Sequence, residues 1–428
     1  MPFLGMRGTG DWGENQRPES WRETILYLYP NGSAPLTALL SMMDSEQVDD
    51  PKFHWWTQTL PSQGGSVTSI HTASSLDSPY AGGGSQGDTL YVEADSDVIN
   101  QMKIGHVVAL RVENDFLSHV TAKVTARDPD SNYVQVRLNS DVRADHDIDD
   151  GDRVIVVTGS MHAEGVEIPE AINYDPVQHT NVTEIFRNSL SITRTARLTR
   201  YRTGDAYSRL KRDTLELHSI EMEKGFMFNQ MYEGVGDNGK PERAMMGLIP
   251  AIFEYEPENV FDYRTDDNAI WNGDAFIDGG EEWINHSLER IFRYGHNEKL
   301  GLCGNGVLLQ LQRVARAGGQ LNLEVNQTDY GIRVVEWTTP FGTLYLKNHP
   351  LMSRNLSMNN DMVILEPDKI RYKYITDTMF KEDNSEWNNT NNSKDSTDEE
   401  YLTEASLEYH HTPAFGYMGG FGQVNTNA

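Results

Sequence analysis

An acidic run at residues 145–152 (DHDIDDGD) is the part of this sequence that most resembles a metal site. Carboxylate oxygens at alternating positions of one loop are the ligands that calcium takes in EF-hands. In that register, position 6 is Asp150 where glycine is required, and position 12 is Val156 where glutamate is required. A polar turn between two strands explains the run equally well. The candidate metal ligands are Asp145, Asp147, Asp149 and Asp152.

Other candidate catalytic or cofactor-binding motifs lack the neighbouring elements or the spacing that their chemistry requires. Gly8-Thr9-Gly10-Asp11-Trp12-Gly13 matches G-x-G-x-x-G, but no strand precedes it, as a dinucleotide-binding turn requires. His162-Ala163-Glu164 and His410-His411 lack the spacing of a zinc protease. We therefore predict a protein that is not an enzyme and that binds no cofactor.

Trp55-Trp56 is the one aromatic pair that could stack on a ligand. With Trp337 and paired acids it would suit an acidic carbohydrate-binding or carbohydrate-active protein, which is the alternative function. Paired acids carry little information in so acidic a chain, and residues 1–20 lack the apolar region of a secretory leader. Anchoring against a neighbouring element is the simpler role for this pair.

Charge and cysteine content limit the classes of partner. The 428 residues contain 64 acids and 36 lysines plus arginines, for a net charge of −28. Such a surface repels phosphate backbones, so neither electrostatic DNA binding nor binding to an anionic membrane is expected. No run of 18 apolar residues predicts a membrane span. The single cysteine, Cys303, excludes an intrachain disulfide and is predicted to be a buried thiol in a reducing cytosol.

The N-terminal half predicts an arm, a loop and a small β-barrel. Residues 1–50 are rich in Gly, Pro and Asn, with one short helix predicted at Ala34–Met43, and Lys52–Gln58 is a hairpin candidate. Residues 62–87 are rich in Gly and Ser and predict an exposed flexible loop. Alternating apolar residues then predict strands, which we assign to a barrel at about 88–160. The strands are predicted at Asp88–Glu93, His106–Glu113, Ser118–Arg127, Tyr133–Leu138 and Asp152–Thr158.

A long amphipathic helix is predicted from Asp205 to Met231. Its apolar stripe is Leu210, Leu217, Ile220, Met227 and Met231. Opposite charges four residues apart, Asp205/Arg209 and Arg212/Glu216, should face water. A helix of this length suits a structural spine.

The C-terminal half predicts a mixed α/β region. Helices are expected at Glu281–Tyr294 and about Asn305–Ala317, and strands at Gly331–Trp337, Thr343–Asn348, Met362–Leu365, Lys369–Ile375 and Leu402–Tyr409. Residues 381–400 hold seven acids and two lysines and predict a solvated acidic, Asn-rich loop.

Taken in order, these segments resemble the major capsid proteins of tailed bacteriophages, in the SU10-like branch of the HK97-type fold. The resemblance covers most of the chain and lies in order and spacing. Its residues are Ala34–Leu40, His54–Gln58, Arg243–Leu248, Ile252, Thr339–Thr343, Asn348–Pro350, Leu365–Pro367, Glu404–Glu408 and Thr412–Ala414.

This resemblance implies an α+β subunit with an N-terminal arm, an extended loop, a long spine helix, an axial domain and an inserted small β-barrel. The implied parts are an arm at 1–50, an extended-loop region at 51–200, a peripheral domain at 201–259 with the spine helix at 205–231, an axial domain at 260–354, and C-terminal peripheral strands at 355–428.

The implied function is self-assembly into hexamers and pentamers of an icosahedral shell. The shell would enclose double-stranded DNA without sequence-specific binding, in a virion assembled in the host cytoplasm. Portal, scaffolding and decoration proteins are further partners that the resemblance allows, and no membrane is involved. A cellular nanocompartment shell is a close variant of this hypothesis.

Overall fold

The computed structural model divides the chain into two compact units, which are described separately. Unit 1 comprises the residues up to Thr57 and those from Gln178 onward, and unit 2 comprises Gln58–Val177. The structure describes residues 44–58, 63–112, 115–144, 147–148, 153–169, 171–201, 204–268, 270–317, 324–329, 332–354, 357–382 and 396–426. The predicted arm before residue 44, with its short helix, lies outside these ranges.

Unit 2 is built on a closed barrel whose strands follow the order β3-β4-β7-β6-β5-β8. Side chains at alternate positions point inward, as in Val120, Ala122 and Val124 on β6, which are all buried. A short helix, α2 (Ser96–Asn100), follows β4. The strands are β3 (Gly64–His71), β4 (Thr89–Ala94), β5 (His106–Val112), β6 (Asp115–Asp128), β7 (Tyr133–Leu138) and β8 (Arg153–Ser160).

The barrel begins earlier than the sequence predicted. Residues 64–71 form β3 and close the barrel by pairing with both β4 and β8, so the prediction of a flexible loop over 62–87 was wrong there. A Cβ on Gly64 would lie 2.5 Å from the Ile155 carbonyl oxygen, and one on Gly65 would lie 2.5 Å from Val98. These glycines therefore mark close approach of the backbone to its neighbours rather than flexibility.

The first sheet of unit 1 has four described strands in the order β1-β19-β20-β10. The short strand β1 (Ser45–Gln47) pairs in parallel with β19 (Ile370–Lys381). Strand β20 (Ser396–Tyr409) runs antiparallel to β19 and also to β10 (Glu184–Thr193). Residues 396–400 therefore belong to a strand, not to the predicted loop at 381–400, because β10 supplies their hydrogen-bonding partners. The rest of that loop, 383–395, lies outside the described residues.

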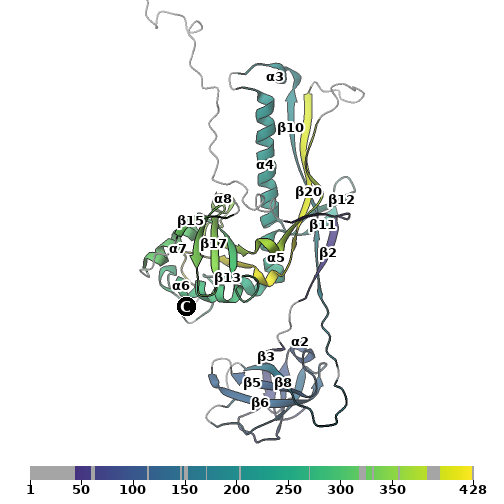
Figure 1. Ribbon diagram of the computed structural model, residues 1–428, viewed down its shortest axis with the longest axis vertical. Helices are drawn as coiled ribbons and strands as arrows, with labels where there is room; N and C mark the ends of the chain where they lie inside the picture. The colour runs from purple at the N-terminus through teal and green to yellow at the C-terminus, as the bar shows by residue number, and fades with distance from the viewer. Residues whose placement is uncertain are drawn as a thin grey trace, which may run out of the picture. The chain divides into compact units, whose positions relative to one another are not determined.

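The spine helix is α4 (Ala206–Phe228), preceded by the five-residue helix α3 (Arg194–Leu198). Asp205, which is exposed as predicted, also caps α4, accepting hydrogen bonds from the backbone N–H groups of Tyr207 and Ser208. The helix ends before Met231, because Asn229 has an extended backbone and its side chain donates to Glu184. Figure 1 shows α4 running alongside β10 and β20.

The apolar stripe predicted for this helix was partly wrong. Leu217, predicted to be in the core, is 56% exposed, whereas polar Thr214, His218 and Glu223 are buried beside Met222 and Phe226. The helix packs against strands that offer polar partners, so polar side chains occupy its inner face.

The second sheet of unit 1 has seven described strands, in the order β13-β21-β18-β14-β17-β16-β15. Two of these strands, β18 and β21, come from the segment 355–428 that was predicted to be peripheral, so this segment is divided between the two sheets. Most strand predictions here were confirmed to within one or two residues. The strands are β13 (Val260–Asp262), β14 (Glu298–Cys303), β15 (Glu324–Asp329), β16 (Ile332–Thr338), β17 (Thr343–Asn348), β18 (Met362–Leu365) and β21 (Gly416–Gly419).

Helices α6 (Phe276–Ile291) and α7 (Asn305–Ala317) accompany the second sheet. The bounds of α7 match the prediction, whereas α6 begins five residues earlier than predicted. Position 279, inside α6, is a glycine because a Cβ there would lie only 2.7 Å from the Trp271 side chain. The remaining short helices of unit 1 are α5 (Leu248–Tyr255) and α8 (Pro350–Arg354).

The candidate hairpin at Lys52–Gln58 is instead a single strand, β2 (Lys52–Thr57). Its partner is β9 (Val177–Val182), more than 100 residues later in the sequence. A hairpin needs its turn inside the segment, and the only local turn signal, Asp49-Asp50-Pro51, precedes it. Smaller strands β11 (Tyr232–Val235) and β12 (Pro241–Ala244) form a separate antiparallel hairpin.

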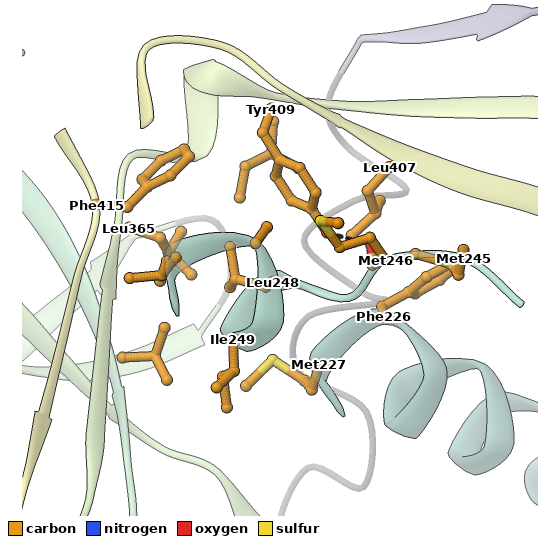
Figure 2. Packing of buried hydrophobic residues seen from close by; sticks show 14 of the residues in the cluster. Phe226, Met227, Met245, Met246, Leu248, Ile249, Leu365, Leu407, Tyr409 and Phe415 are labelled. Carbon is orange, nitrogen blue, oxygen red and sulfur yellow. Dashed lines mark hydrogen bonds between the residues drawn. The ribbon is translucent and has the colours of Figure 1, made fainter. Parts of the chain in front are cut away.

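The main core of unit 1 gathers side chains from α4, α5 and both sheets (Figure 2). Phe226 and Met227 come from the end of α4, Leu248 from α5, and Leu365 and Leu407 from strands of different sheets. Each such burial contributes about 1.5–3 kcal/mol. One apolar core therefore joins the two sheets, and a second core lies between the seven-stranded sheet and helices α6 and α7.

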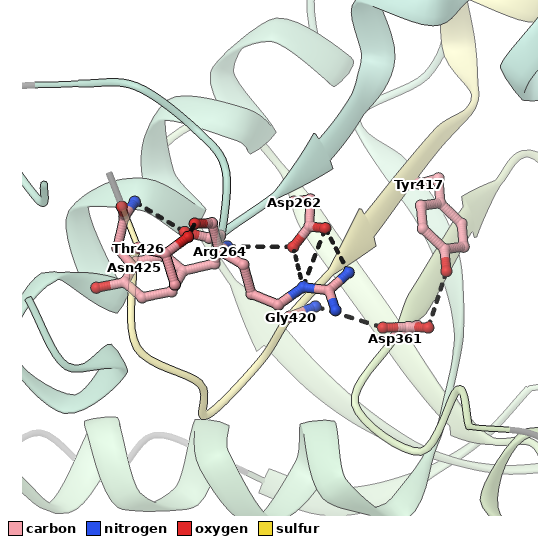
Figure 3. Close-up of polar contacts among 8 residues, drawn as sticks. Asp262, Arg264, Asp361, Tyr417, Gly420, Asn425 and Thr426 are labelled. Carbon is pink, nitrogen blue, oxygen red and sulfur yellow. Dashed lines mark hydrogen bonds and ion pairs between the residues drawn. The ribbon is translucent and has the colours of Figure 1, made fainter. Parts of the chain in front are cut away.

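A polar network fastens the C-terminal segment to the second sheet (Figure 3). Asp361 accepts hydrogen bonds from the Tyr417 hydroxyl (2.8 Å) and the Gly420 N–H (3.3 Å). Arg264 binds Asp262 through both Nε and Nη2, and the Thr426 N–H donates to the Arg264 carbonyl oxygen. Although burial opposes it, the Arg264 hydrogen bonds hold the pKa of Asp262 below its ordinary value.

Lys299 and Glu366 form an ion pair inside unit 1, with 0% and 2% of their side chains exposed. The Lys299 ammonium donates to Glu366 Oε1 (2.7 Å) and to the carbonyl oxygens of Tyr294 and Ala414 (both 2.9 Å). The His296 N–H also donates to Glu366 Oε1. Burial lowers the pKa of Lys299, and Glu366 opposes that shift. The pair thus satisfies three backbone groups, two from the segment after α6 and one from Ala414.

We predict that Lys299→Met lowers the free energy of unfolding by about 3–5 kcal/mol, because it leaves Glu366 as an unpaired buried charge. Lys299→Met/Glu366→Leu should recover only part of this loss, since the Tyr294 and Ala414 carbonyls remain without donors. Urea denaturation of the subunit measures the free energy of unfolding of both variants. Arg293→Met, which breaks the exposed pair Arg293–Glu289, is the control and should change stability by less than about 1 kcal/mol. Full recovery in the double variant would contradict the prediction.

Candidate functional site

The candidate site is the sheet–helix module, which we define as α4 together with β10, β19 and β20. Strand β20 lies between β19 and β10, and α4 packs on β10 and β20. These elements run side by side in Figure 1, and α3 connects β10 to α4 at the end away from the seven-stranded sheet. The inner and outer surfaces of this module differ in chemistry.

A chain of hydrogen bonds crosses the inner surface of the module at His218, which is 1% exposed. Its Nδ1 lies 2.6 Å from Asn188 Oδ1 on β10, and its Nε2 lies 2.7 Å from the Thr403 hydroxyl on β20. Because the Asn188 carbonyl oxygen can only accept, Nδ1 carries the proton and Nε2 accepts from Thr403. The Thr403 hydroxyl is in turn 2.9 Å from that of Thr378 on β19. One neutral imidazole thus connects the helix to all three strands.

Burial lowers the pKa of His218 below its ordinary value of 6.5, and the nearby Glu221 carboxylate opposes the shift. The folded protein therefore binds this proton more weakly than the unfolded chain does. Stability from His218 is present above pH 6.5 and is lost as the pH falls below it.

A second buried polar pair joins α4 to the start of α8. His349 Nε2 lies 2.8 Å from Glu223 Oε1, and both side chains are fully buried. His349 immediately precedes α8, whereas Glu223 lies in the last two turns of α4. The contact therefore fixes the end of the module relative to the seven-stranded sheet.

Asn181 on β9 connects two further segments and is fully buried. Its side-chain amide donates to the carbonyl oxygens of Met246 (3.2 Å) and Leu407 (2.8 Å), and its Oδ1 accepts from the N–H groups of Val182 and Met246. All of its hydrogen-bonding capacity is therefore used within unit 1, which is what a fully buried amide requires.

The outer surface of the module carries apolar side chains that nothing in the described chain covers. Leu215 and Leu217 on α4 are 38% and 56% exposed, and Ile185 on β10 is 54% exposed. Beside Ile185, a hollow of about 570 Å³ opens between β10 and the β11–β12 hairpin, lined also by Glu184 and Tyr232. Exposed apolar groups next to a hollow on a large polar protein are typical of an interaction surface.

The predicted metal ligands are not brought together in what the structure describes. Of the four candidates, only Asp147 lies in the described ranges. Its carboxylate accepts hydrogen bonds from the Tyr80 hydroxyl (2.7 Å) and from the N–H groups of Gly83 and Ile148. These contacts are those of a structural turn. The described residues include no group of three metal-ligating side chains, and the metal site stays a prediction.

Trp55 and Trp56 do not form one surface on which a sugar could stack. Trp55 is buried and stacks on Phe53 and His179, whereas Trp56 faces the other side of β2 and is 62% exposed. Neighbouring residues in a strand point to opposite faces, so the pair cannot present one surface. The anchoring role was therefore correct for Trp55.

Cys303 is a buried thiol, as predicted, and burial raises its pKa to about 12. A thiol in that state is not nucleophilic at neutral pH. None of the described helices combines the length and the apolar content of a membrane span.

Sequence reasoning missed His218, Glu223 and Asn181 as structural residues. His218 and Glu223 interrupt the helical apolar spacing, and a polar residue at a core-facing position is the signal that could have identified them. Asn181 carries no such signal, because its partners come from segments up to 226 residues away.

We predict that His218→Gln flattens the dependence of stability on pH. Wild-type stability should fall between about pH 7.5 and 5.5, since the unfolded histidine takes up a proton that the folded protein excludes. The glutamine variant should be about 1–3 kcal/mol less stable near pH 7.5 and should lose less on acidification. Urea denaturation at the two pH values measures this. His54→Gln, at an exposed position of β2, is the control. If His218→Gln and the wild type lose stability equally on acidification, the assignment is refuted.

The comparisons with known proteins agree with this geometry. The model of the SU10 major capsid protein family matches residues 7–421. The chain is similar to the major capsid protein of Pseudomonas phage PaMx41, with 25% identity over 393 residues, covering 90% of this chain and 85% of that protein.

Solved structures with similar folds include a chain from a phage and a chain from an encapsulin complex. A chain from Mycobacterium phage Bobi covers 96% of this chain and 97% of its own length, at 10% identity and a TM-score of 0.46. A chain of the holo-SrpI encapsulin complex from Synechococcus elongatus PCC 7942 covers 57% of this chain and 75% of its own length, at 10% identity and a TM-score of 0.37.

The family match spans both units, including the barrel, and the family is one of structural shell subunits rather than of enzymes. This chain therefore belongs to the SU10 major capsid protein family and is a tailed-phage capsid protein of the mixed α+β, HK97-like class that forms an icosahedral shell in the virion.

Proposed function

We propose that the chain assembles as hexamers and pentamers, with the sheet–helix module and the seven-stranded sheet in the roles of the peripheral and axial domains. In this assignment β2, β9 and the first residues of β10 belong to the extended-loop region, and the barrel is an insertion within it. The residues before β1 form the arm. The C-terminal strands belong to both sheets and thereby connect the peripheral and axial parts.

The observation that carries this proposal is the exposed apolar surface of α4. The leucine that the sequence pattern assigns to a core, Leu217, is 56% exposed in the single subunit, and Leu215, on another side of the same helix, is 38% exposed. The inner face of the helix is already filled by Met222 and Phe226 and by the His218 hydrogen bonds. No described residue of the subunit covers the outer leucines, so we assign their cover to another subunit, and closed symmetry repeats that contact at every position.

The charge of the chain supports enclosure of DNA without specific binding. A net charge of −28 gives the inner wall of a shell no general attraction for phosphate groups. Packaged double-stranded DNA would then remain mobile. Portal, scaffolding and decoration proteins are proposed as further partners on the family resemblance alone.

We predict that Leu217→Asp reduces the yield of closed shells at least about tenfold, because it places an unpaired charge in an apolar contact that repeats in every subunit. The melting temperature of the unassembled subunit should hardly change, since Leu217 is exposed there. Electron microscopy and sedimentation velocity of the purified protein measure the yield.

Asn297→Asp is the matched control for this variant. Asn297 is an exposed polar residue outside the sheet–helix module, so the same added negative charge should leave the shell yield within about twofold of wild type. Normal shells from Leu217→Asp would show that the exposed face of α4 is not an intersubunit contact.

A further inference from the structure

Helices α6 and α7 carry opposite charges on the surfaces that they turn away from the seven-stranded sheet. The two helices lie next to each other (Figure 1) and share one apolar core with that sheet. The 16 residues of α6 include four acids and one arginine, whereas the 13 residues of α7 include two arginines and no acid. The two helices therefore differ in the sign of their charge, within a chain whose net charge is −28.

The exposed side of α7 combines one leucine with two arginines. Apolar residues fill the core side of this helix, whereas Leu309, Arg313 and Arg316 follow one another at helical spacing on the opposite side. Leu309 is 48% exposed, and both arginines are exposed. Arg313 donates to Gln310 of the same helix (3.5 Å), and neither arginine is ion-paired with any residue that the structure describes. We call these three residues the basic stripe.

The exposed side of α6 has a similar layout with the opposite charge. Ile277 is 53% exposed, and Asp278, Glu281 and Glu282 are exposed beside it. None of these three acids forms an ion pair within the described part of the chain. We call these four residues the acidic stripe.

The two stripes match in spacing as well as in charge. Glu281 lies four residues after Ile277, and Arg313 lies four residues after Leu309. Residues four apart lie on the same side of a helix, about 6 Å apart along its axis. If α7 of one copy lies parallel to α6 of another, the leucine therefore meets the isoleucine while the arginine meets the glutamate.

We propose that the basic stripe of one subunit docks on the acidic stripe of a second copy. Members of this family form closed shells, so other copies adjoin each subunit, and this chain itself supplies both of the complementary surfaces. The inference rests on the proposed assembly and adds a contact outside the sheet–helix module. DNA could attract the two arginines, but it would explain neither the exposed leucine beside them nor the acidic stripe. The contact would also offset part of the repulsion between subunits of charge −28.

Cross-linking tests the partner directly. Leu309→Cys is made in ¹⁵N-labelled protein and Ile277→Cys in unlabelled protein, and the only native cysteine is buried. Shells assembled from the mixture are treated with a short bismaleimide and digested for mass spectrometry. We expect peptides that join labelled position 309 to unlabelled position 277. Cross-links only between like positions, or no cross-links in shells that have formed, would overturn the proposal.

Charge exchange tests the electrostatic match. Arg313→Glu/Arg316→Glu and Glu281→Arg/Glu282→Arg should each lower the shell yield at least about tenfold at about 0.1 M salt, because each places like charges in a contact that repeats around the shell. The variant with all four substitutions exchanges the charges of the two stripes. It should recover the yield to within about threefold of wild type, since the contact pairs opposite charges again.

A matched control separates this contact from an effect of net charge. Arg313→Glu/Arg316→Glu/Glu164→Arg/Glu167→Arg has the same net charge as the fourfold exchange, but its new arginines lie at exposed positions of unit 2. This control should remain as defective as Arg313→Glu/Arg316→Glu. Equal recovery in both fourfold variants would show that net charge alone matters and would contradict the docking contact.

The remaining outcomes separate this inference from the shell assignment. If wild type forms no shells, the proposed assembly fails and this contact fails with it. If wild type and Arg313→Glu/Arg316→Glu form shells equally well, only the docking contact fails, and a lower DNA content in the shells of the variant would assign the arginines to DNA. A lowered melting temperature of the unassembled variant would assign the arginines a structural role, which would also refute the docking contact.

Discussion

Strand β20 is the element on which unit 1 depends, because it must be hydrogen-bonded on both edges by segments distant in sequence. Its partners are β19, about 25 residues earlier, and β10, where Glu184 faces Ala405 across 221 residues. Each edge left unpaired would expose a row of backbone groups. The helix α4 then covers the face that β10 and β20 form. The module can therefore exist only when the middle and the end of the chain have met.

Polar side chains, rather than apolar ones alone, define how these elements fit. The His218 chain, the Glu223–His349 pair and the Lys299–Glu366 pair each connect different elements at fixed geometry. Buried polar groups are costly unless every partner is in place. A wrong register of β20 would leave several of them unsatisfied, so they help to select one arrangement. The apolar core at the junction of α4, α5 and both sheets supplies the general stabilisation.

In this subunit several buried polar side chains have their partners, whereas some apolar side chains on the outside are uncovered by any described residue. Within unit 1 the buried amide of Asn181 and the buried charges of Lys299 and Glu366 have partners, whereas Leu217 on α4 and Leu198 on α3 face solvent. Shell proteins need this asymmetry, since each copy must fold before it can associate and must still keep surface for its neighbours.

The sequence by itself determined the order and type of the barrel strands β4 to β8 and of the helices α4, α6 and α7. Local periodicity and turn residues were enough for β7, β17, β18 and α7, because each of these elements is recognisable from its own residues. Family membership was equally accessible, since it lies in the order of motifs along the chain. Only the tertiary structure decided which face of α4 is buried, that Gly64 and Gly65 lie in a barrel strand, and that residues 396–400 extend β20. These features depend on partners supplied by remote segments, and no local pattern encodes the identity of a remote partner.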